Sequence, residues 1–189
     1  MRNNTNDYVN YFRQLAVSHY LILHDSSQEG PNATQKGKCR FVLFDNDEVV
    51  TGLRSVVPDG IVFYLEMFTG RGVDNLAGDY RGQYQGRFLI AKKVKAMSIT
   101  ELQQAYAECE GVMWDIIGRM LYDNAYAGPD CELPFRNLTL NDFTWEPVSN
   151  LWDGRAGWVV DFNYQQSRED EITNAVVNGE LNPTVWTNE

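Results

Sequence analysis

The sequence predicts an α+β fold: a mostly antiparallel sheet with one long amphipathic helix packed on it, an N-terminal helix and an extended C-terminal arm. Three observations predict this class. Apolar residues recur every three to four positions from Ser98 to Tyr122; the strand-like runs group on either side of that stretch; and the last segment is polar with few apolar residues. We therefore expect one α+β assembly domain over 1–166 and an arm or flexible tail over 167–189.

The first helix is predicted over Asp7–Leu21. Its apolar positions follow helical spacing and share one face, and Thr5 or Asn6 is placed to cap its start: the shared face carries Tyr8, Phe12, Leu15 and His19. The following stretch, Ser26–Lys38, is rich in Gly, Pro, Asn, Ser and Thr, which predicts a loop.

Three strands are predicted next, at Cys39–Phe44, Ile61–Phe68 and Arg87–Val94. The second is an almost unbroken apolar run, which indicates a central strand with both faces covered. Between the second and third, Gly70–Gly86 is rich in Gly, Arg, Asp and Tyr, and is predicted to be a long connector or a hairpin arm.

The long helix is the clearest element. Ser98 and Glu101 have the spacing of a capping box, in which each side chain satisfies a backbone amide at the other's position. Gly128-Pro129 ends the helical pattern. Two further strands are predicted at Phe143–Val148 and Gly157–Tyr164. The second of these alternates apolar and polar residues, which is typical of a half-buried antiparallel strand.

The net charge of −10 is unevenly distributed over the 189 residues. Residues 1–95 carry 12 Lys+Arg against 10 Asp+Glu, whereas residues 96–189 carry 4 against 16. Such an acidic half repels nucleic acid and attracts basic surfaces, including those of neighbouring subunits. No run is long and apolar enough to span a membrane, and the polar start predicts synthesis and folding in the cytosol.

No pattern of catalytic or metal-binding residues stands out. His19 and His24 are five apart, which does not place them on one helix face, and no nucleophile motif accompanies them. His24-Asp25 has the form of an oriented base only in outline. Three widely spaced cysteines indicate buried, reduced thiols: Cys39, Cys109 and Cys131. We therefore expect no enzyme, no metal and no cofactor.

Two segments are candidate contact surfaces. The first is the Gly-rich stretch, whose arginines and tyrosines are candidates for an inter-subunit or lumen-facing loop: Arg71, Tyr80, Arg81, Tyr84 and Arg87. The second is the C-terminal arm, whose apolar residues are candidates for contacts with another subunit: Val176, Val177, Val185 and Trp186. For the first segment a solvated hairpin is the main interpretation and the contact loop its alternative. For the second segment a disordered tail is the alternative.

This layout resembles the tail-terminator (tail-completion) and neck proteins of tailed phages and of phage-tail-like machines. The resemblance covers Tyr8–Gln165 and is carried by the order of the elements and by the late strand that Gly157-Trp158 opens, without a signature motif. It implies a virion structural protein, assembled in the bacterial cytoplasm, that forms a ring, expected to be a hexamer. The ring would cap the tail tube and join it to the neck or head, with DNA passing through its lumen without sequence-specific binding.

Two other functions stay open. A head–tail connector or adaptor would bind the portal instead of the tube. A stand-alone acidic module, such as an inhibitor or immunity protein, would bind one basic partner and stay monomeric.

Overall fold

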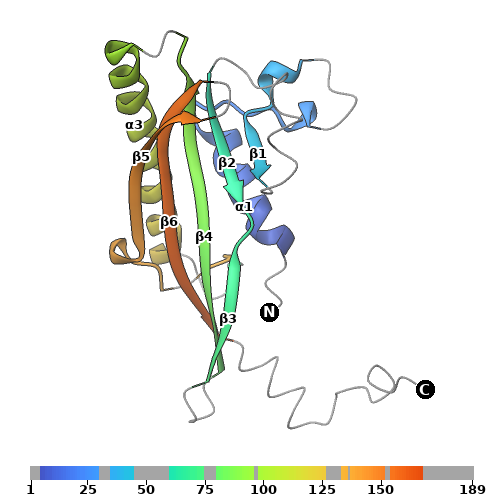
Figure 1. The fold of residues 1–189 in the computed structure, drawn as a ribbon. Helices are drawn as coiled ribbons and strands as arrows, with labels where there is room; N and C mark the ends of the chain where they lie inside the picture. Colours follow the sequence, from blue (N-terminus) through green and yellow to red (C-terminus); the bar gives the residue numbers. More distant parts are fainter. Residues whose placement is uncertain are drawn as a thin grey trace, which may run out of the picture.

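The computed structural model describes residues 5–29, 35–44, 60–74, 80–95, 98–126, 133–135, 137–151 and 154–167 (Figure 1). Two α-helices, six strands and three short 3-10 helices make up this part of the chain. They are, in order, α1 (Thr5–Ser18), η1 (Ser26–Gln28), η2 (Lys36–Lys38), β1 (Phe41–Phe44), β2 (Ile61–Glu66), β3 (Thr69–Asp74), β4 (Tyr80–Lys93), α3 (Ile99–Tyr126), η4 (Leu140–Asp142), β5 (Phe143–Leu151) and β6 (Arg155–Ser167). The C-terminal arm predicted from Val176 to Trp186 lies outside the described residues.

The six strands form one sheet in the order β1-β2-β4-β6-β5, with β3 pairing to the far end of β4. Among these described strands, β1 and β2 pair in parallel and the other pairings are antiparallel. The predicted fold class, a mostly antiparallel sheet with a long helix packed on it and an N-terminal helix, is confirmed.

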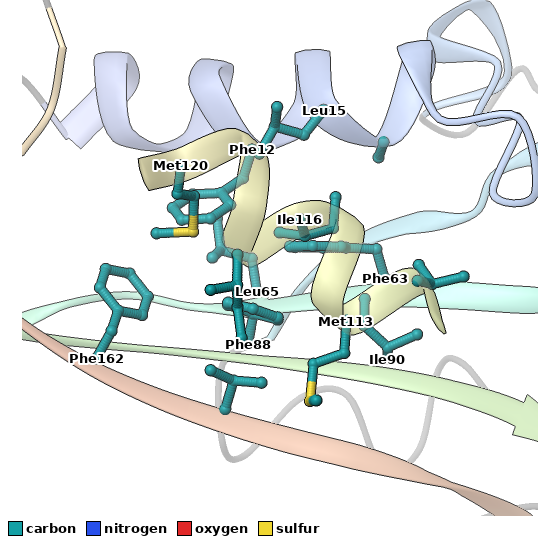
Figure 2. Close-up of a cluster of buried hydrophobic side chains, with 14 of the residues drawn as sticks. Phe12, Leu15, Phe63, Leu65, Phe88, Ile90, Met113, Ile116, Met120 and Phe162 are labelled. Carbon is teal, nitrogen blue, oxygen red and sulfur yellow. The ribbon is translucent and has the colours of Figure 1, made fainter. Parts of the chain in front are cut away.

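Both helices lie on the same face of the sheet, α1 over β1 and β2 and α3 over β4 and β6 (Figure 1). The main core fills the space between these helices and the sheet. Figure 2 shows Phe12 of α1 and Met113, Ile116 and Met120 of α3 together with the sheet side chains they pack against. The side chain of Phe12 is fully buried, with ring centroids 5.8 Å from Phe63 and 6.0 Å from Phe88.

A smaller cluster lies on the opposite face of the sheet. Its buried members are Val62, Tyr64, Leu89 and Ala91, and Val148, Leu151 and Val159 pack against it. All of Ile61–Leu65 is buried, so β2 is covered on both faces, as the unbroken apolar run predicted.

The helix boundaries differ from the predicted ones. Helix α1 begins at Thr5, two residues before the predicted Asp7, so Thr5 and Asn6 lie in its first turn and not before it. At the start of α3, the amide of Glu101 donates to the Ser98 hydroxyl over 3.3 Å, as the capping-box spacing predicted, but the helix continues past Tyr122 to Tyr126. Helix α1 ends at Ser18, three residues before the predicted Leu21. The Ser18 hydroxyl donates to the Gln14 carbonyl over 2.8 Å, and the chain then turns through Leu23 at φ 51°.

The Gly-rich stretch forms the hairpin-arm alternative, because β3 and the first half of β4 pair from Thr69↔Gln85 to Asp74↔Tyr80. Aromatic rings cover three of its glycines. A methyl group at Gly70 or Gly82 would overlap the ring of Tyr84, and one at Gly86 would overlap the ring of Phe162. This cover explains why a segment so poor in strand-forming residues is extended.

Candidate functional site

The candidate surface is a ribbon in which β3 and the ends of β4 and β6 extend the sheet beyond the helix layer (Figure 1). All five residues of the first predicted contact surface belong to it or to its base. Arg71 lies on β3, and Tyr80, Arg81, Tyr84 and Arg87 lie on β4. The structure describes the backbone of Tyr80 but not its side chain.

The three arginines share the sheet face opposite the helices. Along the β4 register their positions alternate with those that face the core. The Arg71 guanidinium donates to Gln83 Oε1 over 2.9 and 2.7 Å. The Arg81 guanidinium donates to Gln165 Oε1 of β6 over 3.4 Å. Gln83 pairs with Gln165 across the ladder, so the two arginine–amide pairs lie side by side. The ribbon thus presents guanidinium and amide groups and no carboxylate at these positions.

Tyr84 points to the face of the sheet that the helices cover, where it packs against the core. Its ring stacks on Tyr164 with centroids 5.1 Å apart and meets Phe68 edge-on at 5.4 Å. Its half-buried ring anchors the ribbon to the body, and the structure does not bring it together with the three arginines.

Arg87 lies at the base of the ribbon in a small cluster of charges. Its guanidinium binds Asp161 with distances of 2.7 and 3.2 Å and lies 4.0 Å from Glu66. The hydrogen bond to Asp161 raises the pKa of Arg87. Burial raises the pKa of Glu66, against the opposing effect of the Arg87 charge. The alternation in β6 places Asp161 on this face, but no sequence signal pairs it with Arg87.

Beside this cluster, a groove of about 210 Å³ opens on the same face. Its floor is apolar and its rim is charged. The lining is Tyr64, Glu66, Arg87, Phe88, Leu89, Glu146, Val148, Leu151 and Val159. A shallower hollow on the ribbon is lined by Arg71, Gln83, Gln85 and Asn163, among others. Surfaces of this composition, apolar with paired charges at the margin, are suited to contact with another protein surface.

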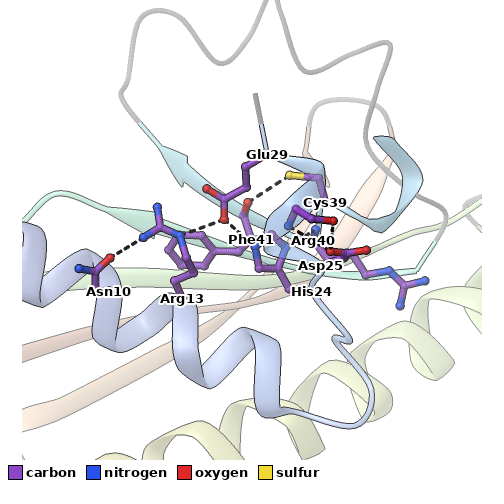
Figure 3. A network of polar contacts seen from close by, with 9 residues as sticks. Asn10, Arg13, His24, Asp25, Glu29, Cys39, Arg40 and Phe41 are labelled. Carbon is purple, nitrogen blue, oxygen red and sulfur yellow. Dashed lines mark hydrogen bonds and ion pairs between the residues drawn. The ribbon is translucent and has the colours of Figure 1, made fainter. Parts of the chain in front are cut away.

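The two histidines serve structural contacts. The His24 side chain is fully buried; its Nδ1 accepts from the amides of Arg40 and Phe41 over 3.1 and 3.2 Å, and its Nε2 lies 2.7 Å from Glu29 Oε1 (Figure 3). Because Nδ1 accepts, Nε2 carries the proton and donates it to Glu29. Asp25, considered from the sequence as the partner of His24, instead accepts from Ser27. His19 pairs with Asp115 of α3 over 3.2 Å.

The described cysteines are free thiols. Cys109 is buried, and burial raises its pKa to about 12, while Cys39 is half-buried with its pKa also raised by burial. Cys131 lies outside the described residues. Among the residues that the structure describes, no group of three or more His, Cys, Asp or Glu is arranged to hold a metal ion. No helix in this part of the chain has the length and hydropathy needed to cross a membrane.

Comparisons with known proteins assign no family to the chain. No family model matches it, and no curated protein matches it in sequence.

Proposed function

We propose that the chain is a non-catalytic virion structural protein that forms a closed ring, expected to be a hexamer. In this proposal the ring caps the tail tube of a phage or phage-tail-like machine and joins it to the neck or head. The protein acts through its surfaces, and its partners are copies of itself, the tube and the neck proteins.

The ribbon is the observation that carries this proposal. It extends the sheet past the two helices, so it is not covered by them. Its Arg71 and Arg81 guanidinium groups remain exposed although each is hydrogen-bonded to a glutamine. An exposed surface that carries two hydrogen-bonded arginines suits either a neighbouring subunit or DNA phosphates in a lumen.

The order of elements also supports it. An N-terminal helix, a hairpin arm, a long helix on a sheet and two late strands follow one another in the structure, and this is the layout on which the resemblance to tail-terminator proteins was based. The polar groups first considered for catalysis, His24 and His19, are held in contacts between α1, its following loop and the rest of the fold.

The test is the assembly state of the purified chain. Sedimentation velocity and negative-stain microscopy over a concentration series should show rings with a central opening. A chain that stays monomeric at every concentration contradicts the proposal, and tight binding of that monomer to one basic protein would point to the acidic-module alternative. Rings that bind a portal and no tail tube would point to the connector.

The C-terminal arm is proposed as a clasp on a neighbouring copy, through Val176, Val177, Val185 and Trp186. These residues lie outside the described part of the chain. Truncation after Ser167 should leave the melting temperature of the isolated subunit unchanged and reduce the fraction of protein in rings. A truncated chain that assembles as well as the full chain would exclude the clasp.

A further inference from the structure

A mixed apolar and small-residue surface covers the side of the molecule where α3 meets the edge strand β5. We call it the α3–β5 side and define it by Ala107, Gly111, Trp114 and Gly118 of α3 with Trp145 of β5. Trp114 and Trp145 are 39% and 38% exposed, and their rings meet edge-on with centroids 4.9 Å apart. A partly exposed tryptophan pair at the junction of two elements is typical of a protein contact surface.

The two glycines of this side have no packing role among the residues that the structure describes. Both lie in the interior of a helix, where glycine is less favourable than other residues. Nothing lies within 4 Å of the position that a Cβ would occupy at Gly111 or at Gly118. Contacts within the described fold therefore do not require glycine at either position. A second surface that packs closely on the helix would require it.

The strand edge beside them is closed to backbone pairing. β5 is the last strand of the sheet, and Pro147 in its middle has no amide hydrogen to donate. The neighbouring Glu146 is exposed and adds charge to the edge. A partner at this side is therefore recognised by side chains on α3 and β5, and sheet extension does not contribute.

The charge of this side fits the opposite side of the same molecule. The acids of the α3–β5 side are Glu110 of α3 and Glu146 of β5, both exposed. Three other acids of α3 pair away from this side: Glu108 with Lys92 of β4, Asp115 with His19, and Asp123 with Tyr11 of α1. At the other end of the sheet order, the described residues 5–29 and 35–44 carry four Lys or Arg against three Asp or Glu. That second surface, which we call the β1 side, includes Lys38, Arg40 and the 42% exposed Leu43, together with Arg13, whose guanidinium is paired with Glu29 over 2.9 Å.

We propose that the α3–β5 side of one copy packs against the β1 side of a second copy. The two surfaces differ in charge and lie at opposite edges of one sheet, so the contact is head-to-tail, and repetition with a fixed rotation closes a ring. The inference rests on the proposed ring function and names the two surfaces that build the ring. Gly111 and Gly118 allow the neighbouring subunit to approach the α3 backbone beside Trp114.

The first experiment is the double variant Gly111→Gln/Gly118→Gln. Because the space around both positions is open in the isolated chain and glutamine favours helix, the melting temperature of the subunit should not fall. Self-association measured by sedimentation velocity should weaken roughly tenfold or more, since the added side chains separate the surfaces. Tyr126→Gln is the matched control, because it places the same side chain at a 74% exposed position in the last turn of α3, roughly 60–80° around the helix from the two glycines, and should leave association unchanged.

The second experiment mixes two blocked subunits. Lys38→Glu/Leu43→Glu disrupts the β1 side, and both double variants should be monomeric alone, with circular dichroism spectra like that of the unmodified chain. Mixed in equal amounts, they should form a one-to-one dimer and nothing larger, because each retains the surface that the other lacks.

The outcomes separate this inference from the proposed function. Rings that form as readily with Gly111→Gln/Gly118→Gln overturn the inference and leave the ring function intact. A β1-side variant that still dimerises alone overturns the head-to-tail pairing, since the α3–β5 side would then bind itself. An unmodified chain that is monomeric throughout overturns the ring function, and the inference falls with it.

Discussion

The buried imidazole of His24 holds together the turn after α1 and the start of β1. It accepts two backbone amides, those of Arg40 and Phe41, at one nitrogen and donates to Glu29 at the other. The imidazole can do this because its acceptor and its donor nitrogen are held apart on one rigid ring. The residue is therefore expected to matter for stability more than its place in an apparent loop suggests.

His24→Phe should destabilise the fold by roughly 2–4 kcal/mol, because it keeps the volume but leaves two buried amides without an acceptor. Urea unfolding measures the loss. Glu29→Gln is the matched control: it keeps an oxygen for the His24 proton and should cost less than about 1 kcal/mol, since Glu29 is partly exposed. Equal losses in the two variants would contradict the role given to Nδ1.

Two carboxylates should respond to pH with opposite signs. Burial raises the pKa of Glu66, so its proton is held more tightly in the folded than in the unfolded state. Its contribution to stability is present at low pH and is lost as pH rises through the folded pKa. The hydrogen bond from Lys92 lowers the pKa of Glu108, so its contribution is present above the unfolded pKa and is lost as pH falls.

Glu66→Gln should therefore improve stability relative to the unmodified chain more at about pH 7 than at about pH 4, and Glu108→Gln should reduce it more at pH 7 than at pH 4. Both differences should be below about 1 kcal/mol, because water screens partly exposed charges. Urea unfolding at the two pH values measures them. The same sign of change in both variants would contradict the two causes.

At this scale the sequence predicts residue types better than residue environments. Helical spacing placed Tyr8, Phe12 and Leu15 on the buried face of α1, and all three are buried. Arg155 lies two residues before the predicted strand Gly157–Tyr164, yet its side chain is fully buried at the start of β6. Burial of a charged residue depends on elements far away in the chain, which local patterns do not encode.

Among the elements, the β4–β6 ladder depends on one close approach. A Cβ at Gly157 would overlap the Ile90 carbonyl oxygen and lie 2.8 Å from the Cα of Ala91, both of them backbone atoms of β4. A neighbouring side chain could rotate away from the added methyl group, but the backbone of a paired strand cannot. Glycine at this position is therefore required by strand packing.

Gly157→Ala should destabilise the fold by roughly 2–4 kcal/mol, since the two central strands must move apart. Gly72→Ala is the matched control, because Gly72 is also paired to β4 but has nothing within 4 Å of its Cβ position. Thermal unfolding of both variants measures the difference. A loss at Gly72 as large as that at Gly157 would show that strand glycines in general, and not this contact, set the cost.

Strands were harder to predict than helices for a physical reason. The capping box and the three-to-four spacing are local, and they placed the start of α3 within one residue. The extension of β4 back to Tyr80 depends on pairing with β3 and β6 and on rings from Tyr84 and Phe162 that cover its glycines. Composition alone predicted Arg71, Arg81 and Arg87 as contact residues. Their glutamine and aspartate partners are set by the register in which the strands pair.

For the whole molecule, the uneven charge has a consequence for assembly. The acidic groups of the second half of the sequence attract basic groups of the first half of a neighbouring copy only where the two surfaces are in contact. Self-association should weaken as NaCl rises, because the screening length falls from about 10 Å at 0.1 M to about 3 Å at 1 M salt. Sedimentation velocity across a salt series measures this. Association that strengthens with salt would indicate an apolar contact in which charge has no part.

The continuity of β4 has a mechanical consequence. This strand of 14 residues spans about 46 Å at 3.3 Å per residue and runs from the tip of the ribbon into the core without a break in its pairing. Tension applied to the ribbon along this direction loads the β4–β6 hydrogen bonds together in shear, where they share the force, and does not unzip them one at a time. Whatever grips the ribbon therefore also pulls directly on the centre of the fold.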